Sequence, residues 1–264
     1  MPAHSQPDAA IELIDVVKEL GGDRILRGAD LTVPEGEITV LLGLSGVGKT
    51  VLIKHVLGLM EPTSGVVRVS GRDLSQLSEQ ELYGLRSTMS AVMQGTLPFT
   101  CGMFFSLNVY ENIAFALRAR MPRWTEERVR EVTMEHLEMV GIADRADDMP
   151  ATLSAGMCKR AVLARALALD ARIVIVDDFD SGIDAVRLRL LCELIRDMQA
   201  TSGASFLVTT HDMAAARELA DHAAVLHEGR IIAEGDPERV FGSTKPVVHQ
   251  LVHGETSGPL KLAS

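Results

Sequence analysis

The segment GLSGVGKT, residues 43–50, has the residue types and the spacing of a loop that binds phosphate groups. Its three glycines allow the backbone to curl until several N–H groups face one anion. Lys49 can reach the β- and γ-phosphates of a nucleotide, and the Thr50 hydroxyl can bind Mg²⁺. We therefore predict a nucleoside triphosphate site formed by Gly43, Leu44, Ser45, Gly46, Val47, Gly48, Lys49 and Thr50.

Two adjacent acids, Asp177 and Asp178, follow the apolar run IVIV at residues 173–176. A side chain at the end of a buried strand emerges at the carboxyl edge of the sheet, where α/β proteins bind ligands. Asp177 is therefore expected to be a Mg²⁺ ligand together with Thr50. Asp178 adds a second carboxylate at the same edge of the sheet.

Apolar runs of strand length alternate with helical patterns, which predicts an α/β fold with a mostly parallel sheet. The strand before the phosphate loop is expected at residues 38–43 and the helix after it at 48–59. Ser78 and Glu81 have the spacing of a capping box, so a short helix should begin there. Further strands are expected at residues 66–70, 172–177 and 204–210.

The chain between about residues 95 and 170 has helical rather than strand-like spacing. Expected helices cover residues 108–121, 125–141 and 155–169. In the second of these helices, one face carries Val129, Val132, Leu137 and Val140, and Gly141 is the expected C-cap. The pattern therefore predicts a helical block inside an α/β core.

The composition limits the class of protein. The chain has 264 residues, of which 47% are hydrophobic, enough for one large domain with a subdomain. A net charge of −10 argues against nucleic acid as a partner, because phosphate backbones bind to basic surfaces. The three cysteines have no metal-binding spacing and are expected to be reduced. The N-terminus lacks a signal-peptide pattern and no apolar run is long enough to cross a bilayer, so we expect membrane contact only through partners.

Several motifs follow the phosphate loop in a fixed order. They are Gln94, LSAGM at residues 153–157, SGID at 181–184 and His211. Over about residues 11–242 this order resembles the ATP-binding subunits of ABC transporters. The resemblance implies a P-loop NTPase (RecA-like) core with a mostly parallel sheet, a small antiparallel N-terminal β part and an inserted α-helical subdomain. The implied ATP-binding domain covers residues 8–242, with the helical subdomain at about 95–170, followed by a C-terminal helix and tail at 243–264.

The same resemblance implies a role for each motif. Two copies of the chain, which we expect to form a homodimer, would pair head to tail around two ATP molecules with Mg²⁺. Gln94 would touch Mg²⁺ and the attacking water, and His211 would contact the γ-phosphate and steady that water. Ser154, Ala155 and Gly156 would bind the γ-phosphate held by the other subunit, while Ser181 and Asp184 would line the dimer interface.

A finer resemblance rests on GMCKRAVLARALALD, SLNVYENIAFALR and KPVVHQLVHG. These segments are similar to the ATPases of Mce- and Mla-type lipid transporters. The similarity implies an integral-membrane permease and Mce-domain substrate-binding proteins as partners, with the subunit in the cytoplasm on the inner face of the membrane. The expected cargo is a lipid or another hydrophobic compound.

Four positions depart from the family pattern. Asp178 stands where the family has the longer glutamate that handles the attacking water, and Phe179 stands where it has a proline. Ala155 replaces the first signature glycine, and Leu20 replaces the aromatic residue that stacks on adenine. Aspartate is one methylene shorter than glutamate, and a displacement of about 1 Å can lower a rate about a hundredfold. We therefore expect ATP to bind and hydrolysis to be slow. Two alternatives stay open: a degenerate nucleotide-binding switch with little hydrolysis, and the ATPase of another ABC importer class.

The loop between Gln94 and Asn108 is longer than the family pattern requires and carries three phenylalanines, Phe99, Phe104 and Phe105. They could pack inside the helical subdomain, or they could form the surface on which a permease docks. The sequence leaves both interpretations open.

Overall fold

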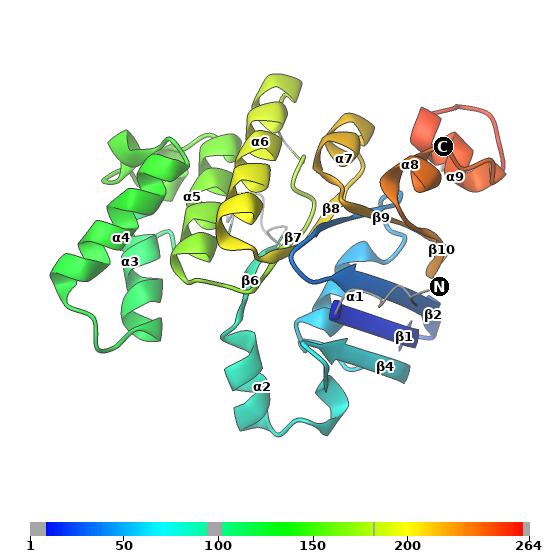
Figure 1. Cartoon of the computed structure of the whole chain (residues 1–264), viewed down its shortest axis with the longest axis horizontal. Coiled ribbons are helices and arrows are strands. Elements are labelled where there is room, and N and C mark those ends of the chain that lie inside the picture. Colours follow the sequence, from blue (N-terminus) through cyan, green and yellow to red (C-terminus); the bar gives the residue numbers. More distant parts are fainter. Residues whose placement is uncertain (1–8, 94–101, 182, 261–264) are drawn as a thin grey trace, which may run out of the picture. The chain divides into compact units, whose positions relative to one another are not determined.

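The computed structural model describes residues 9–93, 102–181 and 183–260. Gln94, Phe99 and Cys101 lie outside these ranges. The chain divides into two compact units, Met1–Tyr83 with Ser205–Ser264 and Gly84–Ala204 (Figure 1). The strands are β1 (Ala9–Leu20), β2 (Asp23–Pro34), β3 (Ile38–Leu42), β4 (Ser64–Val69), β5 (Arg72–Asp73), β6 (Met89–Val92), β7 (Ile173–Val176), β8 (Ser205–Thr210), β9 (His222–His227) and β10 (Arg230–Gly235). The α-helices are α1 (Lys49–Val56), α2 (Glu79–Arg86), α3 (Val109–Arg120), α4 (Glu126–Met139), α5 (Ala155–Ala168), α6 (Ala185–Ser202), α7 (Met213–Leu219), α8 (Pro237–Phe241) and α9 (Pro246–His253).

The first unit begins with an antiparallel sheet in the order β2-β1-β4-β5. β1 and β2 are joined by a two-residue turn, in which Gly21 and Gly22 have φ angles of 60° and 93°. Two consecutive positive φ angles match the right-handed twist of a hairpin, and glycine adopts them without steric cost. This sheet confirms the expected small antiparallel β part near the N-terminus.

The second sheet of this unit is built around β3. All five residues of β3 are buried. The strand lies between β8 and β9 and runs parallel to both, while β10 pairs with β9 in the antiparallel direction. Helix α7 packs against β3 and β8. An apolar strand with neighbours on both sides has its position along the sheet fixed, so the loop that follows it leaves from a defined point.

The C-terminal helices close the first unit. α8 packs on β9, β10 and α9. After α9 the chain turns back, and the buried Gln250 side chain accepts from Leu260 N–H at 2.7 Å and donates to Glu255 C=O at 3.1 Å. The C-terminal segment is therefore held in place as far as Leu260.

The second unit contains the parallel pair β6 and β7 and the helices α3, α4, α5 and α6. α3, α4 and α5 pack on one another, and α5 also contacts β6 and α6. The expected helices are confirmed, each with a polar N-cap that accepts a backbone N–H: Asn108, Thr125 and Ser154. The expected apolar face of α4 is also confirmed, since it is buried.

These elements confirm the predicted fold class: an α/β core with mostly parallel strands, a small antiparallel sheet and a helical block. The predicted capping box is present too, because the Glu81 carboxylate accepts from Ser78 N–H and Glu81 N–H donates to Ser78 Oγ. Across the described ranges, no helix combines the length and the apolar character that a membrane span requires.

Candidate nucleotide-binding site

Residues 43–48 form a tight loop between β3 and α1, and Lys49 and Thr50 begin the helix, as the sequence predicts. Gly43 is buried, and a Cβ there would lie 2.6 Å from the Leu226 carbonyl oxygen. Gly46 and Gly48 have φ angles of 81° and 110°, which L side chains rarely adopt. Three of the eight positions in residues 43–50 therefore require glycine for a local physical reason, and a glycine-rich loop before a helix N-terminus can turn its backbone N–H groups toward one anion.

Lys49 folds back over this loop. Its ammonium donates to the carbonyl oxygens of Gly43 at 2.7 Å and Leu44 at 3.0 Å. Thr50 follows in the first turn of α1, a turn that contains no acidic residue. The site thus combines a cation, a helix N-terminus and a hydroxyl within a few residues, which is suited to a metal-bound polyphosphate.

His211 leaves the sheet at the same edge as the phosphate loop. Thr210, the last residue of β8, is the register partner of Leu42, the last residue of β3. Because the strands are parallel, the next residues, His211 and Gly43, emerge side by side at the carboxyl ends. The structure therefore brings together two of the motifs that lie far apart in the sequence.

Asp177 and Asp178 begin the loop after β7 in the second unit. Asp177 is 3% exposed, and its N–H donates to the Val92 carbonyl at 2.8 Å, continuing the pairing of β7 with β6. Asp178 has a φ angle of 53°, in the left-handed region. Aspartate is one of the few residues enriched there. A proline at position 179 would push residue 178 toward extended backbone, whereas Phe179 leaves it unrestricted and is itself fully buried.

Lys159, on the second turn of α5, donates to three carbonyl oxygens of this loop. The Nζ atom lies 3.1 Å from Asp178 O, 2.6 Å from Phe179 O and 2.8 Å from Ser181 O. Burial lowers the pKa of Lys159 to about 8, against the raising effect of the Asp178 and Asp180 charges. Lys159 is not among the site residues predicted from the sequence motifs. The sequence did contain one signal for a buried lysine. Lys159 lies three and four residues before Val162 and Leu163, so it shares a helix face with these two apolar residues, which are both buried.

The LSAGM motif lies at the N-terminus of α5. The Ser154 side chain caps the helix by accepting from Met157 N–H at 3.3 Å, and both Ser154 and Ala155 are exposed. A cavity of about 260 Å³ adjoins the motif, and its lining comprises Ser154, Gly156, Met157, Arg160, Ile183, Arg187 and Leu191. Two arginines and a helix N-terminus make this cavity suitable for an anion.

Asp184, an expected interface residue, is the N-cap of α6. It accepts from Arg187 N–H at 3.1 Å and forms an ion pair with Arg187 Nη1 at 3.0 Å. These contacts, the backbone hydrogen bond first, lower the pKa of the Asp184 carboxyl. Arg187, which the sequence analysis missed, therefore joins the start of α6 to the cavity beside Gly156.

Phe104 and Phe105 are 52% and 37% exposed, so burial inside the helical subdomain, one of the two open interpretations, is wrong for them. Phe104 makes an edge-to-face contact with Phe115 of α3, with ring centroids 5.5 Å apart, and Phe115 is 50% exposed. The buried Asn112 holds this loop by accepting from Phe104 N–H at 2.7 Å and donating to the Phe104 and Leu107 carbonyls at 3.0 Å each. We call Phe104, Phe105 and Phe115 the aromatic patch.

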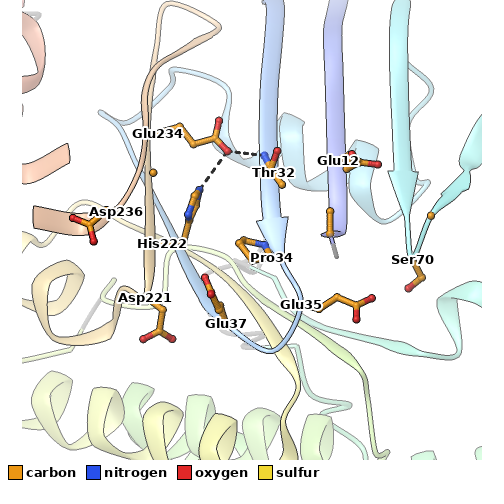
Figure 2. A pocket seen from close by; sticks show the side chains of 13 residues that line it. Glu12, Thr32, Pro34, Glu35, Glu37, Ser70, Asp221, His222, Glu234 and Asp236 are labelled. Atoms are coloured by element: carbon orange, nitrogen blue, oxygen red, sulfur yellow. Dashed lines mark hydrogen bonds and ion pairs between the residues drawn. The ribbon is translucent and has the colours of Figure 1, made fainter. Parts of the chain in front are cut away.

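A larger cavity, of about 1050 Å³, lies elsewhere in the first unit. Figure 2 shows its acidic side chains, which are Glu12, Glu35, Glu37, Asp221, Glu234 and Asp236. Several carboxylates have structural partners: Glu234 accepts from Thr32 N–H and contacts His222, and Asp221 accepts from Ile38 N–H. The cavity adjoins the amino end of β3, opposite the phosphate loop, and its charge would repel a polyphosphate. It is not the nucleotide site.

Comparisons with known proteins agree with this geometry. The sequence profile of the ABC transporter family matches residues 26–181, more than half of the chain. The chain belongs to the ABC transporter family. It contains an ABC-type ATPase domain and is the ATP-binding subunit of such a transporter.

Named relatives cover nearly the whole chain. It is 37% identical to a probable ribonucleotide transport ATP-binding protein, mkl, of Mycobacterium leprae, over 96% of this chain and 72% of that protein. It is 33% identical to the intermembrane phospholipid transport system ATP-binding protein MlaF of Haemophilus influenzae, over 91% of this chain and 89% of that protein. The Escherichia coli K12 MlaF is 32% identical, over 95% of this chain and 91% of that protein.

Solved structures of the same fold include one with ADP and phosphate bound. The cbiO1 subunit of Clostridium perfringens, part of an ABC transporter complex, superposes with a TM-score of 0.80 at 26% identity, covering 90% of this chain and 92% of that one. A dimeric ATP-binding cassette in a post-hydrolysis state with ADP and phosphate superposes with a TM-score of 0.76 at 25% identity, covering 86% of this chain and 98% of that one.

The glycines of the loop supply a test of its geometry. Replacing Gly48 with alanine should lower the free energy of unfolding by more than replacing Gly46. Both changes force alanine into a left-handed conformation, at a cost of about 1–2 kcal/mol. Only the Gly48 change also adds a Cβ within 3.2 Å of Leu26 and 3.3 Å of Ile25, whereas nothing lies within 4 Å of a Cβ at Gly46. Urea unfolding of the two variants measures the difference, and equal losses would show that residue 48 is not crowded.

Proposed function

We propose that this subunit binds ATP·Mg²⁺ at residues 43–50 and hydrolyses it to move lipids or other hydrophobic compounds across or between bacterial membranes. The observation that carries the nucleotide part is the folded phosphate loop, with Lys49 lying across the Gly43 and Leu44 carbonyls at the start of α1. The loop would bind the phosphate oxygens through its N–H groups, and Lys49 would neutralise their charge.

Mg²⁺ suits the oxygen donors that the chain offers. Thr50 supplies a hydroxyl in the first turn of α1, and Asp177 supplies a nearly buried carboxylate at the end of β7. Hard cations prefer such oxygen ligands, and Mg²⁺ would neutralise charge that develops on the phosphates. Gln94 keeps its expected role as a third ligand and lies outside the described residues.

Asp178 and His211 are the proposed residues for the attacking water. Asp178 would accept the water's hydrogen bond, and His211 would steady the water against the γ-phosphate. The short Asp178 side chain starts from a left-handed backbone, so its reach differs from that of a glutamate on extended backbone. We therefore propose slow turnover for the isolated subunit, with ATP binding preserved.

The motif at Ser154 is proposed to act on the ATP of a second copy. Ser154 and Ala155 are exposed at a helix N-terminus, next to a cavity lined by Arg160 and Arg187. A γ-phosphate carried by another subunit could dock there, which supports a head-to-tail homodimer. The Ala155 methyl would reduce the room for that phosphate, which is a second reason for the proposed slow turnover.

The cargo and partners are proposed from the relatives. MlaF is named for phospholipid transport, and this chain matches it over nearly its full length. We infer a permease partner, Mce-domain substrate-binding proteins and a position on the cytoplasmic face of the inner membrane. The name of mkl points instead to ribonucleotide transport, which is the competing substrate class. The aromatic patch is the proposed permease contact, because exposed aromatic rings on a held loop are typical of docking surfaces.

Lys49→Ala should weaken binding of ATP·Mg²⁺ about a hundredfold, since charge-assisted hydrogen bonds contribute up to about 3 kcal/mol. Fluorescence titration with a labelled ATP analogue measures the Kd. Lys54→Ala, which removes a lysine from the last turn of the same helix, is the matched control and should leave the Kd unchanged. Native-like binding by Lys49→Ala would mean that residues 43–50 are not the phosphate site.

Asp178→Glu separates an impaired ATPase from a switch that cannot hydrolyse. If the short carboxylate limits the rate, Asp178→Glu should raise kcat by about tenfold to a hundredfold at constant KM. Steady-state phosphate release from the full chain gives both parameters. If the native chain turns over well above background and Asp178→Glu leaves kcat unchanged, the site already compensates for the missing methylene. If neither protein hydrolyses ATP, the result supports a nucleotide-binding switch with little hydrolysis.

Phe115→Ser should reduce recovery of a membrane permease with the affinity-tagged subunit about tenfold, because buried aromatic anchors dominate interface energies. The measurement is quantitative mass spectrometry of complexes from detergent-solubilised membranes. Tyr83→Ser, which removes another exposed aromatic, on α2, is the control and should have no effect. Equal recovery of the permease with both variants would rule out the aromatic patch as the contact. Identification of the small molecules that co-purify with the native complex would distinguish a lipid cargo from a ribonucleotide cargo.

A further inference from the structure

The three hydrogen bonds of Lys159 use all the donors of its ammonium group. Each N–H has its own acceptor, one carbonyl each from Asp178, Phe179 and Ser181, at 2.6–3.1 Å. Hydrogen bonds from a charged donor are about twice as strong as neutral ones. Because Lys159 is partly buried, water competes weakly for these carbonyls.

The bonds act on a stretch of backbone that is otherwise unfavourable. Asp178 has a φ of 53°, and a non-glycine residue keeps such a conformation only where its surroundings enforce it. The Asp178 carbonyl, at the end of that peptide unit, is one of the Lys159 acceptors. The next residue is anchored twice, through its carbonyl and through the fully buried Phe179 ring. Together these contacts define the direction in which the Asp178 side chain leaves the backbone.

We propose that Lys159 is a positioning residue for ATP hydrolysis, which fixes the loop of residues 178–181 so that the Asp178 carboxylate is held where it handles the attacking water. The inference rests on the proposed role of Asp178. Lys159 itself touches neither nucleotide nor water in this account; it acts through the backbone of the loop.

The same contacts link two motifs within one subunit. Lys159 lies five residues after Ser154 on α5, and Ser181 lies in the loop that leads to Asp184. A displacement of the start of α5, when Ser154 engages the ATP of the other copy, would therefore be transmitted to the backbone of Asp178. Lys159 therefore joins the helix that Ser154 caps to the loop that carries Asp178.

The first test compares Lys159→Met with Lys159→Arg in the full chain. Lys159→Met keeps most of the side-chain volume and removes the donors, so kcat should fall about tenfold or more while the Kd for ATP·Mg²⁺ stays within about twofold. Lys159→Arg keeps charge and donors and should restore most of kcat. Lys245→Met is the matched control, because it also removes a lysine bonded to a backbone carbonyl, that of Ile232, in the first unit. If Lys159→Met does not fold, Lys159→Gln, with two donors, replaces it in the comparison.

The second test is a double-mutant cycle with Asp178→Ala, measured as single-turnover hydrolysis. If Lys159 acts through Asp178, Lys159→Met should lower the rate no further once Asp178 is gone. The proposal would be overturned if the double variant lost the product of the two single-variant rate factors, because the two residues would then act independently. It would also be overturned if Lys159→Met left kcat unchanged, or if it lowered kcat and ATP affinity equally. A rate unaffected by Asp178→Ala would overturn the role of Asp178 as well. If Asp178→Ala slows hydrolysis and Lys159→Met does not, only the inference about Lys159 fails.

Discussion

The burial of β3 between two parallel neighbours is the constraint on which the nucleotide site depends. Its five apolar or β-branched residues have no alternative to the sheet interior, and the register with β8 and β9 fixes where the strand ends. From that point the chain must turn within a few residues into α1. Only glycines satisfy the φ angles and the close approach of Leu226 along that path. The loop geometry is therefore a consequence of the sheet.

Charge in the first unit differs between the two ends of β3. The ammonium of Lys49 and the N-terminus of α1 lie at the carboxyl end of β3, whereas six carboxylates line the cavity near its amino end. The net charge of −10 is thus not spread evenly over the chain. Two of these acids accept backbone N–H groups, Glu234 from Thr32 in β2 and Asp221 from Ile38 at the start of β3, so they stabilise these strands locally. The polarity also favours approach of an anionic ligand from the phosphate-loop end.

The loop after β7 gives Asp178 and Phe179, the two residues there that the family resemblance marks as departures, a common explanation. Aspartate tolerates a left-handed backbone better than glutamate does, and phenylalanine, unlike proline, permits that backbone in the residue before it. The buried Phe179 ring and the three carbonyls bound by Lys159 then hold the conformation. The two substitutions are therefore parts of one local structure, to which Lys159 also belongs.

Local patterns in the sequence were sufficient for the loop of residues 43–48, the strand before it, the capping box of Ser78 and Glu81, and the three helices expected at residues 108–121, 125–141 and 155–169. Each depends on residues within a few positions, whose conformational preferences act without the rest of the fold. The fold class could also be predicted from the sequence, because a chain of alternating strands and helices has few arrangements that bury the apolar faces of both.

Only the tertiary structure decided which distant groups meet. The acceptors of Lys159 lie 19 to 22 residues away along the chain, and the acidic cavity gathers residues from Ala9 to Asp236. His211 and Gly43 are adjacent because the register of β3 and β8 pairs the residues before them. Phe104 is exposed because its backbone is hydrogen-bonded to the buried Asn112 side chain, which fixes the loop. A side chain's type limits the bonds that it can form, but which carbonyl lies within 3 Å depends on the packing of the whole chain.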